Sequence, residues 1–277
     1  MSERIKVVIA GINGRMGRAS ARLLSGSEEA QLAGAFGRPG AGYVGKDTGE
    51  LTGAGSWGIL VSNDLEGLPA GTRPDVLLDF SFAEAAFENA KMALDRGIRP
   101  VIGTSGLGEE EIRVLSEIAS SKGTGALVVP NFSVGAVLMI EFARQAGRFF
   151  SNVELVEMHH TRKVDAPSGT AMYTASRLAS VSDSFNRQEV EEKELVPGSR
   201  GGVTKAGVRI HSLRLPGLIS HQEVIFGSQG ELLTIRHDSF NTDCFLKGIV
   251  LAVKAVMKLD RLVVGLENIL ELNDTAN

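Results

Sequence analysis

The stretch IKVVIAGINGRMGR, residues 5–18, decides the fold, because an apolar run leads into a glycine-rich turn and then a helical pattern. Gly11, Gly14 and Gly17 follow the apolar run at intervals of three. Glycines at such a turn let the backbone approach a pyrophosphate, which the N–H groups of the following helix bind. The spacing differs from G-x-G-x-x-G, so the turn alone is compatible with a nucleotide cradle or with a plain strand-to-helix turn.

Strand and helix patterns continue to alternate as far as about residue 129. Four more apolar runs are predicted to be buried parallel strands, at residues 32–36, 76–81, 100–106 and 126–132. Two of the intervening helical patterns end on Gly97 and Gly123, as helices commonly end on glycine. Repeated strand–helix–strand units predict an α/β fold with a doubly wound parallel sheet.

A second, α+β domain is predicted from about residue 130. A helical pattern, a strand and a polar stretch come first, at residues 134–149, 153–160 and 182–202. Three alternating runs then follow one another closely, as antiparallel strands do, at residues 207–215, 221–227 and 231–239. The tail from Phe245 to Leu270 returns to helical periodicity. We therefore assign residues 1–130 and 241–277 to the first domain and residues 131–240 to the second.

The composition argues against several classes of partner and location. The formal net charge of -4 is not that of a nucleic-acid-binding protein. The first apolar run breaks at Gly11 and Asn13, so no signal peptide is predicted, and no apolar stretch approaches the roughly 20 residues of a membrane span. The single cysteine, Cys244, cannot form an internal disulfide. We expect a cytoplasmic protein that binds neither nucleic acid nor membrane.

The residues after the second strand bear on the choice of dinucleotide. An acid that hydrogen-bonds the adenosine ribose is expected there, but the sequence is FGRPG, residues 36–40. Gly37 takes the place of the acid, and Arg38 offers a cation that can bind a 2′-phosphate. A solvated loop arginine is the alternative interpretation. NADPH is favoured over NADH.

The segment ELVEMHHTRKVDAPSGTA, residues 154–171, is the most informative part of the chain. Because consecutive strand residues point to opposite faces, His159 and His160 are not expected to share one metal ion, and no metal site is predicted. With Lys163 the two imidazoles form a positive, proton-exchanging group suited to a carboxylate substrate. A chance grouping is the alternative interpretation.

Ser168, Gly169 and Thr170 open the next helical run and offer N–H groups and hydroxyls to an anion. An ordinary N-cap would explain these residues equally well. A cluster of cations and an anion cradle within one segment indicate a small dicarboxylate substrate.

Six motifs, in this order along the chain, resemble the 4-hydroxy-tetrahydrodipicolinate reductase family. They are GINGRMGR (11–18), DFS (79–81), GTSG (103–106), PNFSVGAVLM (130–139), EMHHTRKVDAPSGTA (157–171) and RLPGLISHQEVIFG (214–227). The resemblance implies a nicotinamide-dependent reductase of a cyclic dicarboxylate, usually a homotetramer, in diaminopimelate and lysine biosynthesis. It also implies an N-terminal Rossmann-like domain completed by a C-terminal helix, and a central domain for substrate and oligomer contacts.

The resemblance further implies roles for individual residues. His159 would donate or accept a proton, Lys163 would be a second proton donor, and Arg38 would meet the adenosine phosphate. The residues implied to bind the substrate carboxylates are His160, Ser168, Gly169 and Thr170. Those implied to hold the pyrophosphate are Gly11, Ile12, Asn13, Gly14, Arg15 and Met16. Those implied to line the nicotinamide are Gly103, Thr104, Ser105, Val129, Pro130, Asn131 and Phe132.

Three positions depart from the pattern of the family. Gly37 stands where Glu or Asp is frequent, which argues against a preference for NADH; Ser105 replaces a usual threonine; and Thr242 replaces a common arginine, a change for which we have no functional account. Two other functions remain open. One is a Rossmann reductase of another imino or keto acid, and the other is a non-catalytic dinucleotide-binding homologue.

Overall fold

The computed structural model describes residues 3–187 and 190–270, and the chain divides into two compact units. The first unit runs to Val134 and resumes at Phe245, and the second is Gly135–Cys244. The domain boundaries expected from the sequence lay at residues 130 and 240.

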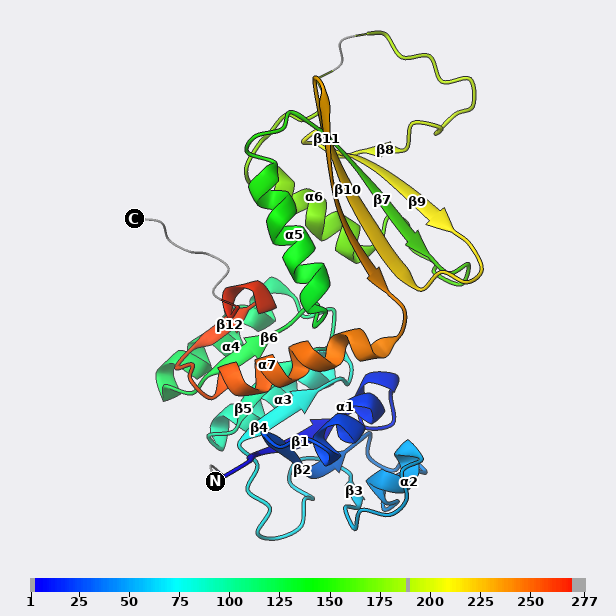
Figure 1. Ribbon diagram of the computed structural model, residues 1–277. Helices are drawn as coiled ribbons and strands as arrows, with labels where there is room; N and C mark the ends of the chain where they lie inside the picture. The colour runs from blue at the N-terminus through cyan, green and yellow to red at the C-terminus, as the bar shows by residue number, and fades with distance from the viewer. Residues whose placement is uncertain (1–2, 188–189, 271–277) are drawn as a thin grey trace. The chain divides into compact units, whose positions relative to one another are not determined.

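The first unit is built on a seven-stranded sheet in the order β12-β6-β5-β4-β1-β2-β3 (Figure 1). Its strands are β1 (Ile5–Ala10), β2 (Ala30–Phe36), β3 (Val61–Ser62), β4 (Val76–Asp79), β5 (Arg99–Ile102), β6 (Ala126–Val128) and β12 (Leu262–Val264). All neighbouring strands are parallel. From β1 the chain builds the sheet first in one direction and then, from β4, in the other. The predicted doubly wound α/β fold is confirmed.

Helices cover both faces of this sheet. They are α1 (Arg15–Ser25), α3 (Ala83–Asp95), α4 (Glu109–Lys122) and α7 (Leu246–Val256), with a short α2 (Thr48–Thr52) after β2. α3 and α4 share a buried cluster in which Leu94 and Leu115 pack with Ile102 of β5. Because strand–helix–strand crossovers are right-handed, α1 and α3 lie on opposite faces of the sheet. Gly123 ends α4 with a φ of 58°, and Gly97, with a φ of 71°, follows α3, so both predicted helix ends are confirmed.

The tail is not helical throughout, contrary to the prediction. After α7, Leu262–Val264 form β12, which pairs in parallel with β6, and Leu266–Asn268 form the 3-10 turn η2. Two of the three β12 residues are valines, which favour strands. Pairing with the open edge at β6 therefore outweighs a helical periodicity that extends over only a few residues.

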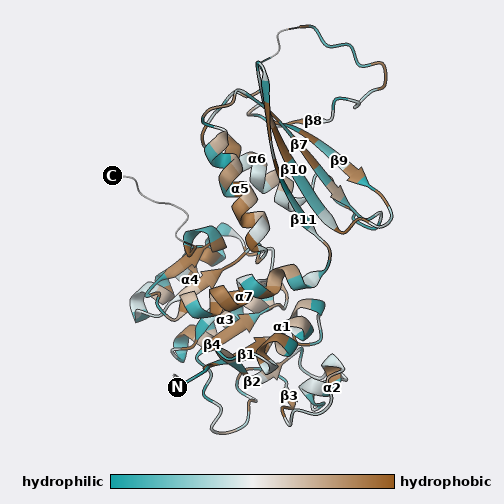
Figure 2. Cartoon of the chain, in the orientation of Figure 1, coloured by the Kyte–Doolittle hydropathy of each residue, from teal (hydrophilic) through white to brown (hydrophobic). Residues whose placement is uncertain are grey.

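The second unit is a five-stranded mixed sheet in the order β11-β10-β7-β9-β8. Its strands are β7 (Asn152–His159), β8 (Gly202–Val203), β9 (Arg209–Arg214), β10 (Ser220–Ser228) and β11 (Glu231–Ser239). Helices α5 (Val134–Ala146) and α6 (Gly169–Ala179) share a buried core with one face of the sheet, and Figure 2 shows the apolar residues of α5. The 3-10 turn η1 (Thr242–Phe245), which contains Thr242, follows β11.

Residues 207–215, 221–227 and 231–239 alternate in direction as predicted, but β9 pairs with β7 and, antiparallel, with β8 rather than with β10. β9 is parallel to β7, whereas β10 is antiparallel to both β7 and β11. The chain travels from β7 to β9 by way of α6, and such a strand–helix–strand crossover gives parallel pairing. β7 lies between β9 and β10, so the short link at residues 215–219 joins strands that are not neighbours.

Candidate active site

The cofactor residues predicted from the sequence lie at one edge of the parallel sheet. The strands β1, β2, β5 and β6 are parallel, so their carboxyl ends meet at the same edge, beside the switch point between β1 and β4. The predicted segments directly follow these strands. They are residues 11–16 after β1, 37–38 after β2, 103–105 after β5 and 129–132 after β6.

The turn between β1 and α1 requires glycine at two positions. Gly11 has a φ of +77°, and a Cβ there would lie 2.5 Å from the carbonyl oxygen of Phe80. A Cβ on Gly17 would lie 2.4 Å from the carbonyl oxygen of Gly11, so α1 packs directly on the turn. The N-cap of α1 is Gly14, which has no side chain to accept the first N–H groups of the helix. This turn fits a bound dinucleotide, because the exposed positive end of the helix suits a phosphate.

Asp79, which was not predicted as a site residue from the sequence, organises the loops beside this turn. The carboxylate is fully buried at the end of β4. It accepts hydrogen bonds from the Ser81 N–H at 2.8 Å, the Asn89 side-chain amide at 2.8 Å and the Thr104 hydroxyl at 3.0 Å. An acid directly after the apolar run VLL was the available sequence signal. Asp79 thus fixes the loop that contains residues 103–105.

Two aromatic rings hold the next two predicted segments together. Phe80 and Phe132 meet edge to face with centroids 5.7 Å apart. A Cβ on Gly103 would lie 2.4 Å from Phe80 and 2.6 Å from Phe132, so only glycine fits between the rings. The Val129 N–H donates to the carbonyl of Ile102 at 2.8 Å and continues the sheet pairing past β6. The loops after β5 and β6 are thereby packed against each other.

The second group of predicted residues lies at the carboxyl end of β7. Val153 and Leu155 point into the core of the second unit, and strand alternation places Glu157 and His159 on the same face. The His159 Nδ1 lies 2.5 Å from Oε2 of Glu157. Arg214, opposite His159 on β9, donates to both oxygens of the Glu157 carboxylate, at 2.7 and 3.0 Å. Glu157 and Arg214 were not predicted as site residues from the sequence.

The electrostatics of this group follow from its burial. Burial alone would raise the pKa of Glu157, but hydrogen bonds from Arg214, Ser212 and His159 outweigh it and lower the pKa. Burial is also the largest influence on His159, and it lowers the pKa of the imidazole in spite of the adjacent carboxylate. A charged Glu157 therefore holds a ring that releases a proton more readily than a free histidine.

The loop after β7 brings the predicted lysine to the same end of the strand. The Lys163 N–H donates to the carbonyl of His160 at 3.1 Å, and its Nζ donates to the carboxylate of Asp165 at 2.8 Å. Arg214 also donates to the Asp165 carbonyl at 2.8 Å, so one guanidinium joins the loop to Glu157. Nδ1 of His160 is buried and has no hydrogen-bond partner among the described residues, which is unusual for a buried polar atom.

Ser168, Gly169 and Thr170 lie at the start of α6. Ser168 is the N-cap, and its hydroxyl accepts the N–H of Ala171 at 3.2 Å. The N-cap interpretation therefore accounts for this hydroxyl. Gly169 is exposed, and a Cβ there would meet nothing within 4 Å. The N–H groups of Gly169 and Thr170 belong to the first turn, which has no carbonyl partners within the helix.

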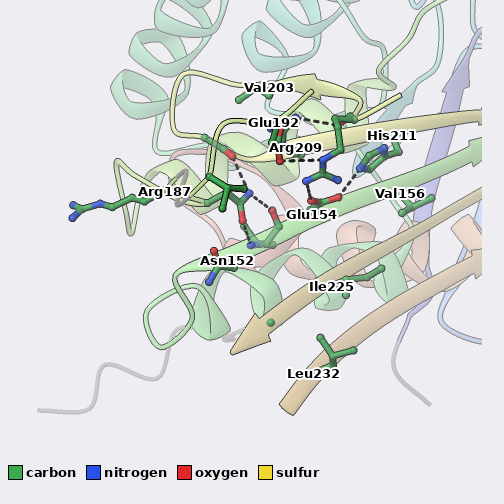
Figure 3. A pocket seen from close by; sticks show the side chains of 16 residues that line it. Asn152, Glu154, Val156, Arg187, Glu192, Val203, Arg209, His211, Ile225 and Leu232 are labelled. Atoms are coloured by element: carbon green, nitrogen blue, oxygen red, sulfur yellow. Dashed lines mark hydrogen bonds and ion pairs between the residues drawn. The ribbon is translucent and has the colours of Figure 1, made fainter. Parts of the chain in front are cut away.

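A separate pocket of about 700 Å³ lies on the opposite face of the second sheet (Figure 3). Glu154, which alternates with Glu157 along β7, contacts His211 at 2.7 Å and Arg200 at 2.8 Å there. Arg209 and Arg200 both pair with Glu192. None of the predicted site residues lines this pocket, so we do not assign the chemistry to it.

No three His, Cys, Asp or Glu side chains in residues 3–187 and 190–270 are grouped so that they can hold a metal ion. Over the same ranges, no helix has the length and apolar character needed to cross a membrane.

Comparison with known families covers both units. The family described as dihydrodipicolinate reductase, N-terminus, matches residues 5–132. The family described as dihydrodipicolinate reductase, C-terminus, matches residues 135–270. The two matches together span nearly all of the described chain.

Individual relatives give the same result. The 4-hydroxy-tetrahydrodipicolinate reductase of Moorella thermoacetica is 46% identical over 98% of this chain and 100% of its own length. The enzyme of the same name from Synechococcus elongatus is 44% identical, with the same two coverages. A dipicolinate-bound dihydrodipicolinate reductase from Paenisporosarcina sp. TG-14 is similar in structure, with a TM-score of 0.87, 38% identity, and coverage of 96% of this chain and 99% of that one.

Proposed function

Because this chain belongs to the dihydrodipicolinate reductase family, we propose that it reduces 4-hydroxy-tetrahydrodipicolinate to tetrahydrodipicolinate with a nicotinamide dinucleotide. The overall reaction adds a hydride and a proton to the substrate and releases one water. The observation that carries the proposal is the buried Glu157 that holds His159 beside Lys163, since reduction of this substrate needs a proton-exchanging group. We assign the step to diaminopimelate and lysine biosynthesis in the cytoplasm.

We infer that the first unit binds the dinucleotide along the carboxyl edge of its sheet. Residues 11–16 would hold the pyrophosphate, and residues 103–105 and 129–132 would line the nicotinamide, which supplies the hydride when the dinucleotide is bound. Gly37 and Arg38 support NADPH rather than NADH, because the ribose-binding acid is missing and a cation is present for the 2′-phosphate.

We infer that the second unit binds the substrate at the carboxyl end of β7. His159 and Lys163 would exchange the proton, and their positive charge would stabilise the negative charge that develops during reduction. The buried ring nitrogen of His160 and the N–H groups at the start of α6 are donors for carboxylates. Gly169, Thr170 and the backbone N–H of Ser168, whose hydroxyl caps the helix, would bind one carboxylate and His160 another, as a cyclic dicarboxylate requires.

The experiment that tests this function is an assay of NADPH and NADH oxidation on substrate generated enzymatically in the same vessel. We expect turnover with both dinucleotides, a higher kcat/KM with NADPH, and tetrahydrodipicolinate as the product. Absence of product with either dinucleotide would rule out the proposed reaction.

The two alternative functions predict other results in the same assay. A reductase of another imino or keto acid would turn over such acids and leave 4-hydroxy-tetrahydrodipicolinate unchanged. An amine dehydrogenase from Mycobacterium smegmatis has a TM-score of 0.66 to this chain, but at 18% identity this likeness concerns the fold alone. A non-catalytic homologue would bind NADPH without turnover, and the Glu157, His159 and Arg214 group argues against it.

We also propose that the chain forms a homotetramer through the face of the second sheet that α5 and α6 leave open. Leu232 is 76% exposed, and Leu213 is also exposed. A sheet face that no helix covers is usually polar, so exposed apolar side chains support a protein interface there. Light scattering should give four chain masses for the wild type and a smaller mass for Leu232→Asp. A monomeric wild type would contradict the proposal.

A further inference from the structure

The ring of Tyr43 fills the space in which a side chain at residue 37 would lie. A Cβ built on Gly37 would be 2.3 Å from Cε2 and 2.7 Å from the hydroxyl oxygen of Tyr43. The φ of Gly37 is not positive, so the backbone there accepts any residue. The tyrosine ring, rather than the backbone, therefore keeps a larger side chain out of this position.

The hydroxyl of Tyr43 is held beside Arg38. It accepts the Arg38 backbone N–H at 3.1 Å. The surrounding loop is tied to the edge of the sheet, because the Gly45 N–H donates to the carbonyl of Val61 at 2.8 Å and the Gly40 N–H donates to the Asn63 side chain at 3.0 Å. Tyr43 is half-buried, so the loop holds its ring in place at the carboxyl end of β2.

The chemistry of a phenol at this place differs from that of an acid. A hydroxyl that accepts one hydrogen bond keeps its own proton, which it can donate. A carboxylate at the end of β2 accepts hydrogen bonds from the two ribose hydroxyls and repels a 2′-phosphate, whereas a neutral phenol donates to the phosphate without repulsion. The exposed Arg38 guanidinium has no ion-pair partner within residues 3–187 and 190–270.

We propose that Tyr43 is the residue that selects the dinucleotide, by occupying the place of the ribose-binding acid and donating its hydroxyl proton to the 2′-phosphate of NADPH. Arg38 supplies the countercharge from the adjacent position. This role rests on the proposed dinucleotide-binding function. It adds a hydrogen-bond donor for the 2′-phosphate, which neither Gly37 nor the charge of Arg38 replaces.

The test is calorimetric binding of adenosine 2′,5′-bisphosphate, 5′-AMP, NADPH and NADH to the full chain. Tyr43→Phe keeps the ring and removes the hydroxyl. We expect it to raise the Kd of NADPH and of the bisphosphate about tenfold, the size expected for a hydrogen bond to a charged group, and to change the Kd of NADH and 5′-AMP less than about twofold. Tyr173→Phe is the matched control, because it removes the other tyrosine hydroxyl of the chain, in the second unit.

A second variant tests the steric part of the inference. Tyr43→Ala combined with Gly37→Glu removes the ring and installs the acid in the space thus opened. We expect the preference for NADPH to become a preference for NADH, with a Kd for NADPH at least about tenfold above the Kd for NADH. The proposed role of Tyr43 is overturned if Tyr43→Phe leaves the ratio of the NADPH Kd to the NADH Kd unchanged, or if Tyr173→Phe alters that ratio equally. Either result would leave the proposed function standing. A wild type that binds neither dinucleotide would overturn both.

Discussion

The fully buried carboxylate of Glu157 lies 2.5 Å from Nδ1 of His159, two residues later on the same face of β7. This contact occupies one ring nitrogen, so Nε2 is the nitrogen left to exchange a proton with a substrate. The ring itself is only 11% exposed, which limits its motion. Glu157 is therefore a positioning residue for the proton transfer that we propose for His159.

Replacing Glu157 by Gln should lower kcat about tenfold to a hundredfold. The amide keeps the shape of the side chain, but it removes the charge that fixes the His159 tautomer and pairs with Arg214. Steady-state kinetics with NADPH measures the effect. The pH dependence of kcat should shift as well, because the carboxylate raises the pKa of His159 against the effect of burial.

Glu154→Gln is the matched control for this variant. Glu154 lies on the same strand and also contacts a histidine and an arginine, His211 and Arg200, but on the opposite face of the sheet. We expect its kcat and its pH profile to match those of the wild type. Equal losses in Glu154→Gln and Glu157→Gln would mean that Glu157 stabilises the sheet and does not position His159.

His159→Ala and Lys163→Ala should each lower kcat by about 10² to 10⁴, the range typical of general acid–base catalysis. The dinucleotide Kd should stay within about twofold, since the proposed dinucleotide residues belong to the other unit. His211→Ala, which removes a histidine outside the candidate site, is the control. Wild-type kcat in either alanine variant would refute the role assigned to that residue.

The sequence was sufficient for the features that depend on neighbouring residues. The turn at Gly11 follows from an apolar run and glycine spacing, and the ends of two helices follow from Gly97 and Gly123. His159 and Lys163 are four positions apart, so a loop after one strand brings them to the same end of β7. Local patterns predict such features because the chain has little freedom over a few residues.

The sequence was insufficient wherever a partner is distant along the chain. Arg214 reaches Glu157 only because β9 pairs in parallel with β7, and the sequence of strand runs did not indicate that β9 lies beside β7 rather than beside β10. Tyr43 similarly meets Gly37 through a loop whose path no periodicity reveals. The strand β12 was missed because its pairing with β6 depends on the finished sheet.

Ser168 and Thr170 should respond differently to loss of their hydroxyls. Ser168→Ala removes the N-cap bond to Ala171 and should lower the free energy of unfolding by about 1 kcal/mol, with little change in KM. Thr170→Val should leave stability nearly unchanged and raise the KM for the dicarboxylate about tenfold, if its hydroxyl binds a carboxylate. Denaturant unfolding and kinetics on both variants separate the two roles. A raised KM in Ser168→Ala alone would reverse these assignments.

Asp47 should govern the acid stability of the first unit. The residue is 7% exposed, and its carboxylate accepts hydrogen bonds from five donors. These are the N–H groups of Gly49, Glu50, Trp57 and Gly58 and the hydroxyl of Ser56. The hydrogen bond from the Trp57 N–H has the largest effect on the pKa of Asp47. Together with the other hydrogen bonds it outweighs burial, which raises the pKa, and lowers the pKa to about 2.

Asp47→Asn should therefore reduce the free energy of unfolding by about 2 kcal/mol at neutral pH, as expected when a charged cap is lost. An unfolded Asp titrates near pH 3.9, so the contribution of Asp47 is complete above about pH 4 and is lost as the pH falls toward 2. The difference between variant and wild type should shrink over that interval in denaturant unfolding. The control is Asp64→Asn, which removes a carboxylate that accepts a hydrogen bond from the Gly67 N–H. It should lower the free energy of unfolding by less than Asp47→Asn does. A constant difference from about pH 7 to about pH 2 would contradict the assignment of this stability to the charge of Asp47.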